Sequence, residues 1–118
     1  MQPEERDAAY LWDMLQAARE IIDMNSDAAF EAFIDDLKLM RATERGLEIL
    51  GEAARRVSPV FTRKHPQIAW HAMIGQRNIL AHEYGQIDYE LLYRTVRDDI
   101  PELIRQLKLL VPDMGGEA

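Results

Sequence analysis

Helical periodicity is the feature that most restricts the fold of this chain. Apolar residues recur at spacings of three and four along most of its length, and no stretch keeps the alternation typical of a strand. Residues 6–24 and 37–61 carry the clearest stripes, the second with heptad spacing. Their apolar positions are Ala8, Leu11, Leu15, Ala18 and Ile22, then Met40, Leu47, Leu50, Ala54, Val57 and Phe61. The sequence therefore predicts an all-α protein.

Capping and turn residues mark the expected ends of the first three helices. The segment "NSD" at residues 25–27 offers cap side chains for a short second helix. A long third helix is expected over residues 37–61, and Ser58 and Pro59 should disturb its end.

Two more helices are expected in the second half of the chain. Pro66 is well placed to open a fourth helix that runs almost to Gly85, its expected C-terminal cap. A fifth helix is expected from about Asp88, and Pro101 should kink or break it. These elements predict a single domain over residues 1–118, an up-and-down bundle of about five helices. Its exposed apolar stripes favour a homodimer.

The composition limits the possible functions. The chain has no cysteine, which excludes disulfides, thiolate zinc sites and a cysteine nucleophile, and which favours the cytoplasm. The first ten residues lack the layout of a signal peptide, and no apolar run could span a membrane. The three histidines show no ligand spacing, so no metal and no other cofactor are expected.

Charge is divided unevenly along the sequence. The net charge of −7 argues against a nucleic-acid-binding protein. Residues 37–82, however, hold eight basic and three acidic residues, a charge of +5, between flanks of −8 and −4. A local basic surface can face phosphates even on an acidic protein. Ordinary charge scatter is the alternative explanation.

A row of charged residues follows the third expected helix. Glu44, Glu48, Glu52 and Arg56 recur at a spacing of four. They lack the Glu-x-x-His pairs of carboxylate-bridged metal sites in helical bundles. We therefore interpret the row as a solvent-exposed face whose glutamates pair with arginines.

The stretch "RNILAHEYG" at residues 77–85 holds the candidate site. Arg77 occupies a position of the apolar stripe where leucine would be expected, and it shares a face with Tyr84, whereas Asn78 and His82 share another. Arginine binds phosphate in a bidentate way, and histidine transfers protons near neutral pH. On RNA, His82 could activate a 2′-hydroxyl while Arg77 stabilises the charged transition state, without a metal.

Each of these residues also has a structural explanation. Arg77 could lay its stem on the core, and His82 could favour the negative end of the helix dipole. Asn78 could pair with His82, and Tyr84 could be a packed aromatic with a hydrated hydroxyl. Four such residues within eight positions at one helix end favour a functional site.

These residues carry a resemblance to a known family. "RNILAH" at 77–82 matches the Arg-x4-His motif of the HEPN superfamily (higher eukaryotes and prokaryotes nucleotide-binding), and Tyr84 extends it to the Arg-x4-His-x-Tyr pattern of HepT toxins. The segments "LEILGEAARRVS" at 47–58, "HPQIAWHAMIGQRN" at 65–78 and "YELLYRTVRDDIPELIRQL" at 89–107 agree. The resemblance covers nearly the whole chain.

The resemblance implies a fold, an activity and partners. HepT proteins are five-helix bundles that form homodimers, with the motif near the dimer cleft. They are RNA-cleaving toxins of toxin–antitoxin pairs. Their antitoxin, MntA, is a minimal nucleotidyltransferase that transfers AMP groups from ATP to the motif tyrosine, here Tyr84. We therefore expect Arg77 to bind phosphate, His82 to transfer protons and Asn78 to orient the site.

Two alternatives to a ribonuclease toxin stay open. The chain could be a non-catalytic HEPN module that binds a nucleotidyltransferase partner or a nucleotide. It could also be a purely structural dimeric bundle. The second is less favoured, because an arginine on an apolar stripe costs free energy unless it has a partner or a function.

Overall fold

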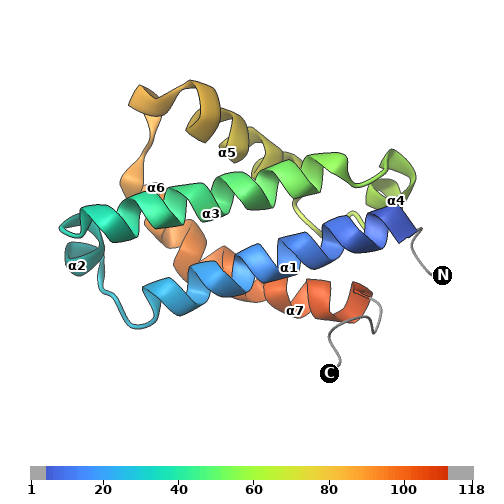
Figure 1. The fold of residues 1–118 in the computed structure, drawn as a ribbon, viewed down its shortest axis with the longest axis horizontal. Coiled ribbons are helices and arrows are strands. Elements are labelled where there is room, and N and C mark those ends of the chain that lie inside the picture. The colour runs from blue at the N-terminus through green and yellow to red at the C-terminus, as the bar shows by residue number, and fades with distance from the viewer. Residues whose placement is uncertain (1–4, 112–118) are drawn as a thin grey trace.

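The computed structural model describes residues 5–111, which form a bundle of helices (Figure 1). The elements in chain order are α1 (Glu5–Asn25), α2 (Phe30–Ile34), α3 (Leu37–Arg56), α4 (Pro59–Lys64), α5 (Trp70–His82), the 3-10 turn η1 (Tyr84–Gln86), α6 (Tyr89–Arg94), the π-helical turn η2 (Thr95–Asp99) and α7 (Ile100–Leu110). No strand occurs among these described residues, so the predicted all-α fold is confirmed.

Helices α1 and α3 form the centre of the bundle, and the other long helices pack against these two. Helices α1 and α3 lie side by side and run in opposite directions, with α7 against α1 and α5 against α3 (Figure 1). Helix α5 is therefore an outer helix whose main neighbour is α3. Its C-terminal end and η1 lie at the periphery of the bundle in the view of Figure 1.

The core lies where α1, α3 and the α6–α7 segment meet. All six apolar positions predicted for residues 37–61 are buried, as the heptad spacing indicated. On α1 the buried position at the end of the stripe is Ile21, and Ile22 only packs at its edge. Continuous burial of this kind supplies most of the stability of amphipathic helices.

The prediction of one long helix over residues 37–61 is wrong, whereas the disturbance expected at Ser58 and Pro59 is confirmed. Helix α3 ends at Arg56, and Ser58 begins α4 by accepting a hydrogen bond from the backbone N–H of Phe61 at 3.2 Å. Pro59 explains the break, because it disfavours helical backbone at the residue before it and fits the first turn of a new helix.

Three predicted helix ends are also wrong. The "NSD" segment at 25–27 does not cap α2, because Asn25 instead donates to the carbonyl of Ile21 and to the Thr43 hydroxyl. Pro66 lies in a turn, and α5 begins only at Trp70. Gly85 lies in η1 with a negative φ, so it is not a left-handed cap.

The last helical segment follows the prediction more closely. Asp88 caps α6 by accepting a hydrogen bond from the N–H of Leu91 at 3.1 Å. The expected distortion at Pro101 is confirmed as the π-helical turn η2, which precedes it. A wider turn accommodates the missing N–H and the bulk of the proline ring, so the helix continues to Leu110.

Candidate active site

Helix α5 presents the Arg-x4-His motif at the edge of the bundle. Trp70 and Leu80 are buried and anchor the helix. Arg77 faces α3 and lies against Gly51, where an added Cβ would come within 2.4 Å of the Arg77 Cβ. The absence of a side chain at Gly51 therefore allows the two helices to approach closely at Arg77.

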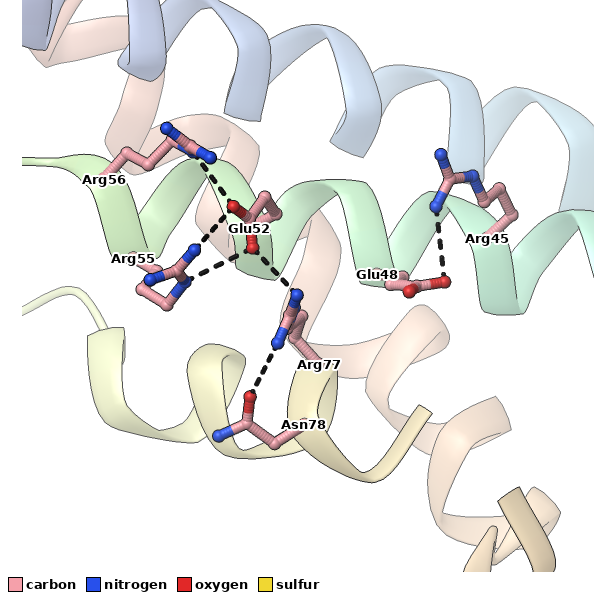
Figure 2. Close-up of polar contacts among 7 residues, drawn as sticks. All are labelled: Arg45, Glu48, Glu52, Arg55, Arg56, Arg77 and Asn78. Carbon is pink, nitrogen blue, oxygen red and sulfur yellow. Dashed lines mark hydrogen bonds and ion pairs between the residues drawn. The ribbon is translucent and has the colours of Figure 1, made fainter. Parts of the chain in front are cut away.

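The guanidinium of Arg77 is held at both Nη atoms (Figure 2). Nη2 forms an ion pair with Oε1 of Glu52 at 3.1 Å, and Nη1 donates to Oδ1 of Asn78 at 3.0 Å. Nε is buried and has no hydrogen-bond partner among the described residues. These interactions explain how a charged residue is accommodated where leucine was expected.

Glu52 binds two further arginines of α3 (Figure 2). Arg55 donates from Nη2 to Oε2 at 2.8 Å and from Nε to Oε1 at 3.3 Å, and Arg56 donates from Nε to Oε2 at 2.9 Å. The hydrogen bond from Arg55 is the main reason that the pKa of the Glu52 carboxyl falls to about 2, with further help from Arg56 and Arg77 against the effect of burial. Glu52 is therefore ionised in the folded protein.

Tyr84 is fixed at the other end of the motif. Its hydroxyl donates to Oε1 of Glu44 at 2.5 Å, and the guanidinium of Arg41 lies 5.4 Å from the centre of its ring. Arg41 also donates to Oε2 of Glu44 at 2.9 Å. The hydrogen bond to Glu44 is the largest cause of a raised pKa of the Tyr84 hydroxyl, and burial adds to it.

The interpretation of the glutamate row is partly right. Glu48 and Glu52 pair with arginines, as expected, with Arg45 at 3.4 Å from Glu48. Glu44 also pairs with an arginine, Arg41, but it is only 5% exposed, so the solvent-facing part of the interpretation is wrong for it. The sequence did not link the row to the motif. The spacings could have indicated the link. Glu44 and Glu52 are eight residues apart, and Arg77 and Tyr84 are seven apart. On two antiparallel helices, such similar spacings let Arg77 meet Glu52 while Tyr84 meets Glu44.

Three of the four motif residues lie on α5, and Tyr84 is the first residue of η1. Arg77 and Tyr84 both reach α3, as the periodicity predicted, and Asn78 is joined to Arg77. His82 is the last residue of α5 and is exposed, and its side chain makes no hydrogen bond within residues 5–111. The alternative in which Asn78 pairs with His82 is wrong in this structure. The imidazole is therefore open to solvent.

An apolar groove separates α5 from α6 and α7. It has a volume of about 620 Å³. Its apolar lining includes Met73, Ile79, Leu80, Leu91, Ile100 and Leu103. Ile79 and Leu91 are exposed on it, although both are large and apolar. Such a surface is typical of a region that another molecule covers.

The part of the chain that the structure describes contains neither a cluster of metal ligands nor a membrane-spanning helix. No three His, Cys, Asp or Glu side chains within residues 5–111 gather where they could hold a metal ion. Over the same residues, no helix combines the length and the apolar character that crossing a bilayer requires.

Comparison with known proteins places the chain in a family. The family model described as "Ribonuclease HepT-like" matches residues 14–110. A Thermococcus cleftensis protein named "Probable ribonuclease HepT" is 39% identical over 80% of this chain and 86% of its own length. A Methanocaldococcus jannaschii protein provisionally named an RNase is 37% identical over 86% of this chain and 94% of its own length. No solved structure matches the chain. The chain belongs to the HepT-like ribonuclease family.

Proposed function

We propose that this chain is a metal-independent endoribonuclease, the toxin of a toxin–antitoxin pair, with its whole length acting as one domain. Family membership supports ribonuclease activity. One observation carries the assignment of the site: the motif ends at an exposed helix terminus, with Arg77 ordered by Glu52 and with His82 open to solvent. A phosphate-binding group and a proton acceptor are thus provided at neighbouring turns of α5.

The chemistry follows from these two side chains. His82 accepts the proton of a ribose 2′-hydroxyl, and the 2′-oxygen forms a bond to the adjacent phosphorus. The bond from phosphorus to the 5′-oxygen breaks, and this oxygen takes a proton from water. His82 passes its proton to the hydroxide that remains and is neutral again. The products are a 2′,3′-cyclic phosphate and a 5′-hydroxyl. Arg77 stabilises the extra negative charge on the phosphoryl oxygens, and Asn78 holds its guanidinium.

A homodimer is part of the proposal. The apolar groove beside α5 exposes Ile79, which follows Asn78 and precedes His82 by about one helical turn. A second copy of the chain on this groove would cover the apolar surface and bring two motifs together. Paired motifs would enlarge the site along an RNA strand.

Control by an MntA-like nucleotidyltransferase is the regulatory part of the proposal. Tyr84 is half exposed, so its ring lies within reach of a partner. Transfer of AMP from ATP to its hydroxyl, with release of pyrophosphate and loss of the phenol proton, would replace a neutral group with a phosphodiester close to the motif. The added negative charge would repel RNA and compete for the arginines. RNA and ATP are both cytoplasmic, which is the compartment that we propose.

A non-catalytic module that binds the nucleotidyltransferase is the competing function. The ion pair of Arg77 with Glu52 favours it, because this guanidinium is already engaged before any substrate binds. The test is degradation of RNA by the purified, unmodified protein in EDTA, beside His82→Ala. Cleavage by the wild type alone supports a metal-independent nuclease. No cleavage by either protein, with Tyr84 shown by mass spectrometry to be free of AMP, would favour the binding module.

A further inference from the structure

Glu52 gathers three guanidinium groups at one point on the protein surface (Figure 2). Two belong to consecutive residues of α3, and the third is Arg77 of α5. In Figure 2, Arg56 lies on the side of Glu52 toward α1, whereas Arg55 and Arg77 lie on the opposite side. The cluster therefore extends the motif from α5 onto the end of α3.

The geometry leaves the arginines capacity for a ligand. Each oxygen of Glu52 pairs with two guanidinium nitrogens, which uses the four or so acceptor sites of a carboxylate. A guanidinium has five N–H donors. Arg55 uses two of them on Glu52, whereas Arg56 uses one on Glu52 and also hydrogen-bonds Tyr10 of α1. Both side chains are about half exposed. Unused donors are thus accessible from solvent.

The charge of the cluster points to an anionic ligand. Three arginines and one carboxylate carry a net charge of +2, on a chain whose total is −7. Holding like charges together is unfavourable unless an anion compensates them. The groove between α1 and α3 is lined by Arg56, Arg77 and Glu52 of the cluster itself. It also holds Asp13 and Glu20, and these two carboxylates would repel an anion inside it. An anion is therefore best received outside this groove, at the solvent-exposed sides of Arg55 and Arg56, which are each about half exposed.

We propose that Arg55, Arg56 and Arg77, organised by Glu52, form a binding surface for the sugar–phosphate backbone of single-stranded RNA. Glu52 acts as a positioning residue, because it fixes the guanidinium of Arg77 without itself touching substrate. Arg55 and Arg56 bind phosphates that flank the one being cleaved. The assignment of RNA as the ligand rests on the proposed function, and it extends the site by two arginines outside the motif.

Binding of RNA tests the surface without requiring cleavage. In a His82→Ala background, the affinity for a fluorescein-labelled single-stranded RNA is measured by fluorescence anisotropy at several KCl concentrations. Arg55→Ala and Arg56→Ala should each weaken binding and reduce the slope of log K against log[KCl] by about 0.7 for each phosphate that the arginine neutralises in the wild type. Arg45→Ala is the matched control, since it removes the same charge from α3 at a residue that pairs with Glu48 instead.

The outcomes separate this proposal from the proposed function. A larger loss of affinity for Arg55→Ala and Arg56→Ala than for Arg45→Ala supports the surface, even if the wild type proves unable to cleave RNA. Equal losses in all three variants, or none, would overturn the surface and leave the nuclease assignment standing.

Glu52 has a test of its own in the protein that retains His82. Glu52→Gln removes the charge that holds Arg77, so kcat should fall by roughly tenfold to a hundredfold. Glu48→Gln removes a carboxylate one turn earlier on α3 and should leave kcat unchanged. Glu52→Asp keeps a carboxylate and should restore part of the rate, with circular dichroism confirming that each variant folds. Equal kcat values for the two glutamine variants would overturn the positioning role.

Discussion

Gly51 of α3 and Arg77 of α5 pack so closely that a Cβ on Gly51 would lie 2.4 Å from the Cβ of Arg77. The same added atom would approach the backbone carbonyl oxygen of Met73 to 2.7 Å. Neither neighbour is the flexible end of a side chain. The close packing sets the position of the Arg77 stem, and Glu52, the next residue of α3, then receives its guanidinium.

Replacing Gly51 should therefore destabilise the protein. In an unobstructed helix, Gly→Ala stabilises by up to about 1 kcal/mol. At Gly51 the clash should reverse this sign, and Gly51→Ala should lower the free energy of unfolding by about 1–3 kcal/mol. Gly75→Ala on α5 is the control, because an added Cβ there meets nothing within 4 Å. Urea denaturation measures both; a Gly51→Ala protein as stable as the wild type would contradict the prediction.

Arg77 should matter more for activity than for folding. Arg77→Ala leaves Glu52 paired with Arg55 and Arg56, so the free energy of unfolding should change by no more than about 1 kcal/mol. Removing the transition-state stabilisation should lower kcat by about a hundredfold or more. Arg77→Lys should recover little, because lysine lacks the planar, bidentate geometry. A purely structural bundle would show the reverse pattern, with reduced stability and no activity in the wild type.

The sequence predicts the helices, most of the core and the motif, because these depend on local spacing. It also predicts that Arg77 and Tyr84 face the same side. It does not predict Gly51, Glu52 and Glu44 as their neighbours, because those pairings depend on how α5 is registered against α3. The spacing of the glutamates was compatible with a solvent-exposed row, and only tertiary packing distinguishes a buried Glu44 from the more exposed Glu48.

The errors at helix ends have the same origin. The boundary at Pro66 follows from a rule about proline at the first helical turn. In the structure, the indole Nε1 of Trp70 donates to the carbonyl of His65 at 2.9 Å, and the chain between them forms a turn. An interaction of this kind overrides the local preference.

Ion pairing at Glu52 should make its contribution to stability depend on pH. Folding lowers the pKa of the Glu52 carboxyl from 4.5 to about 2. The ion pairs therefore stabilise the folded protein fully above the pKa of the unfolded chain. This stabilisation is lost as the pH falls toward the pKa of the folded protein. The free energy of unfolding of the wild type minus that of Glu52→Gln should thus be constant near neutral pH and shrink between about pH 4.5 and about pH 2. Urea denaturation over this range measures it. A difference that does not change with pH would show that the ion pairs do not bias folding.

The hydrogen bond from Tyr84 to Glu44 should keep the phenol protonated. A negative carboxylate beside the hydroxyl raises the Tyr84 pKa. Glu44→Gln should therefore lower it toward the ordinary value, which NMR of ring-labelled tyrosine can follow at the Tyr84 signal. Glu48→Gln, one turn further along α3, should leave that signal unchanged. An unaltered titration in Glu44→Gln would mean that the hydrogen bond is not formed in solution.

The apolar groove should be the dimer contact. Leu91 is 50% exposed within it, so Leu91→Lys removes little core packing but places a charge where a second copy would bind. We expect this variant to be monomeric by size-exclusion chromatography with light scattering, and to cleave RNA poorly because the two motifs no longer pair. Leu109→Lys is the control, since Leu109 is 78% exposed and lies outside the groove. A Leu91→Lys protein that remains dimeric would place the dimer interface on another surface.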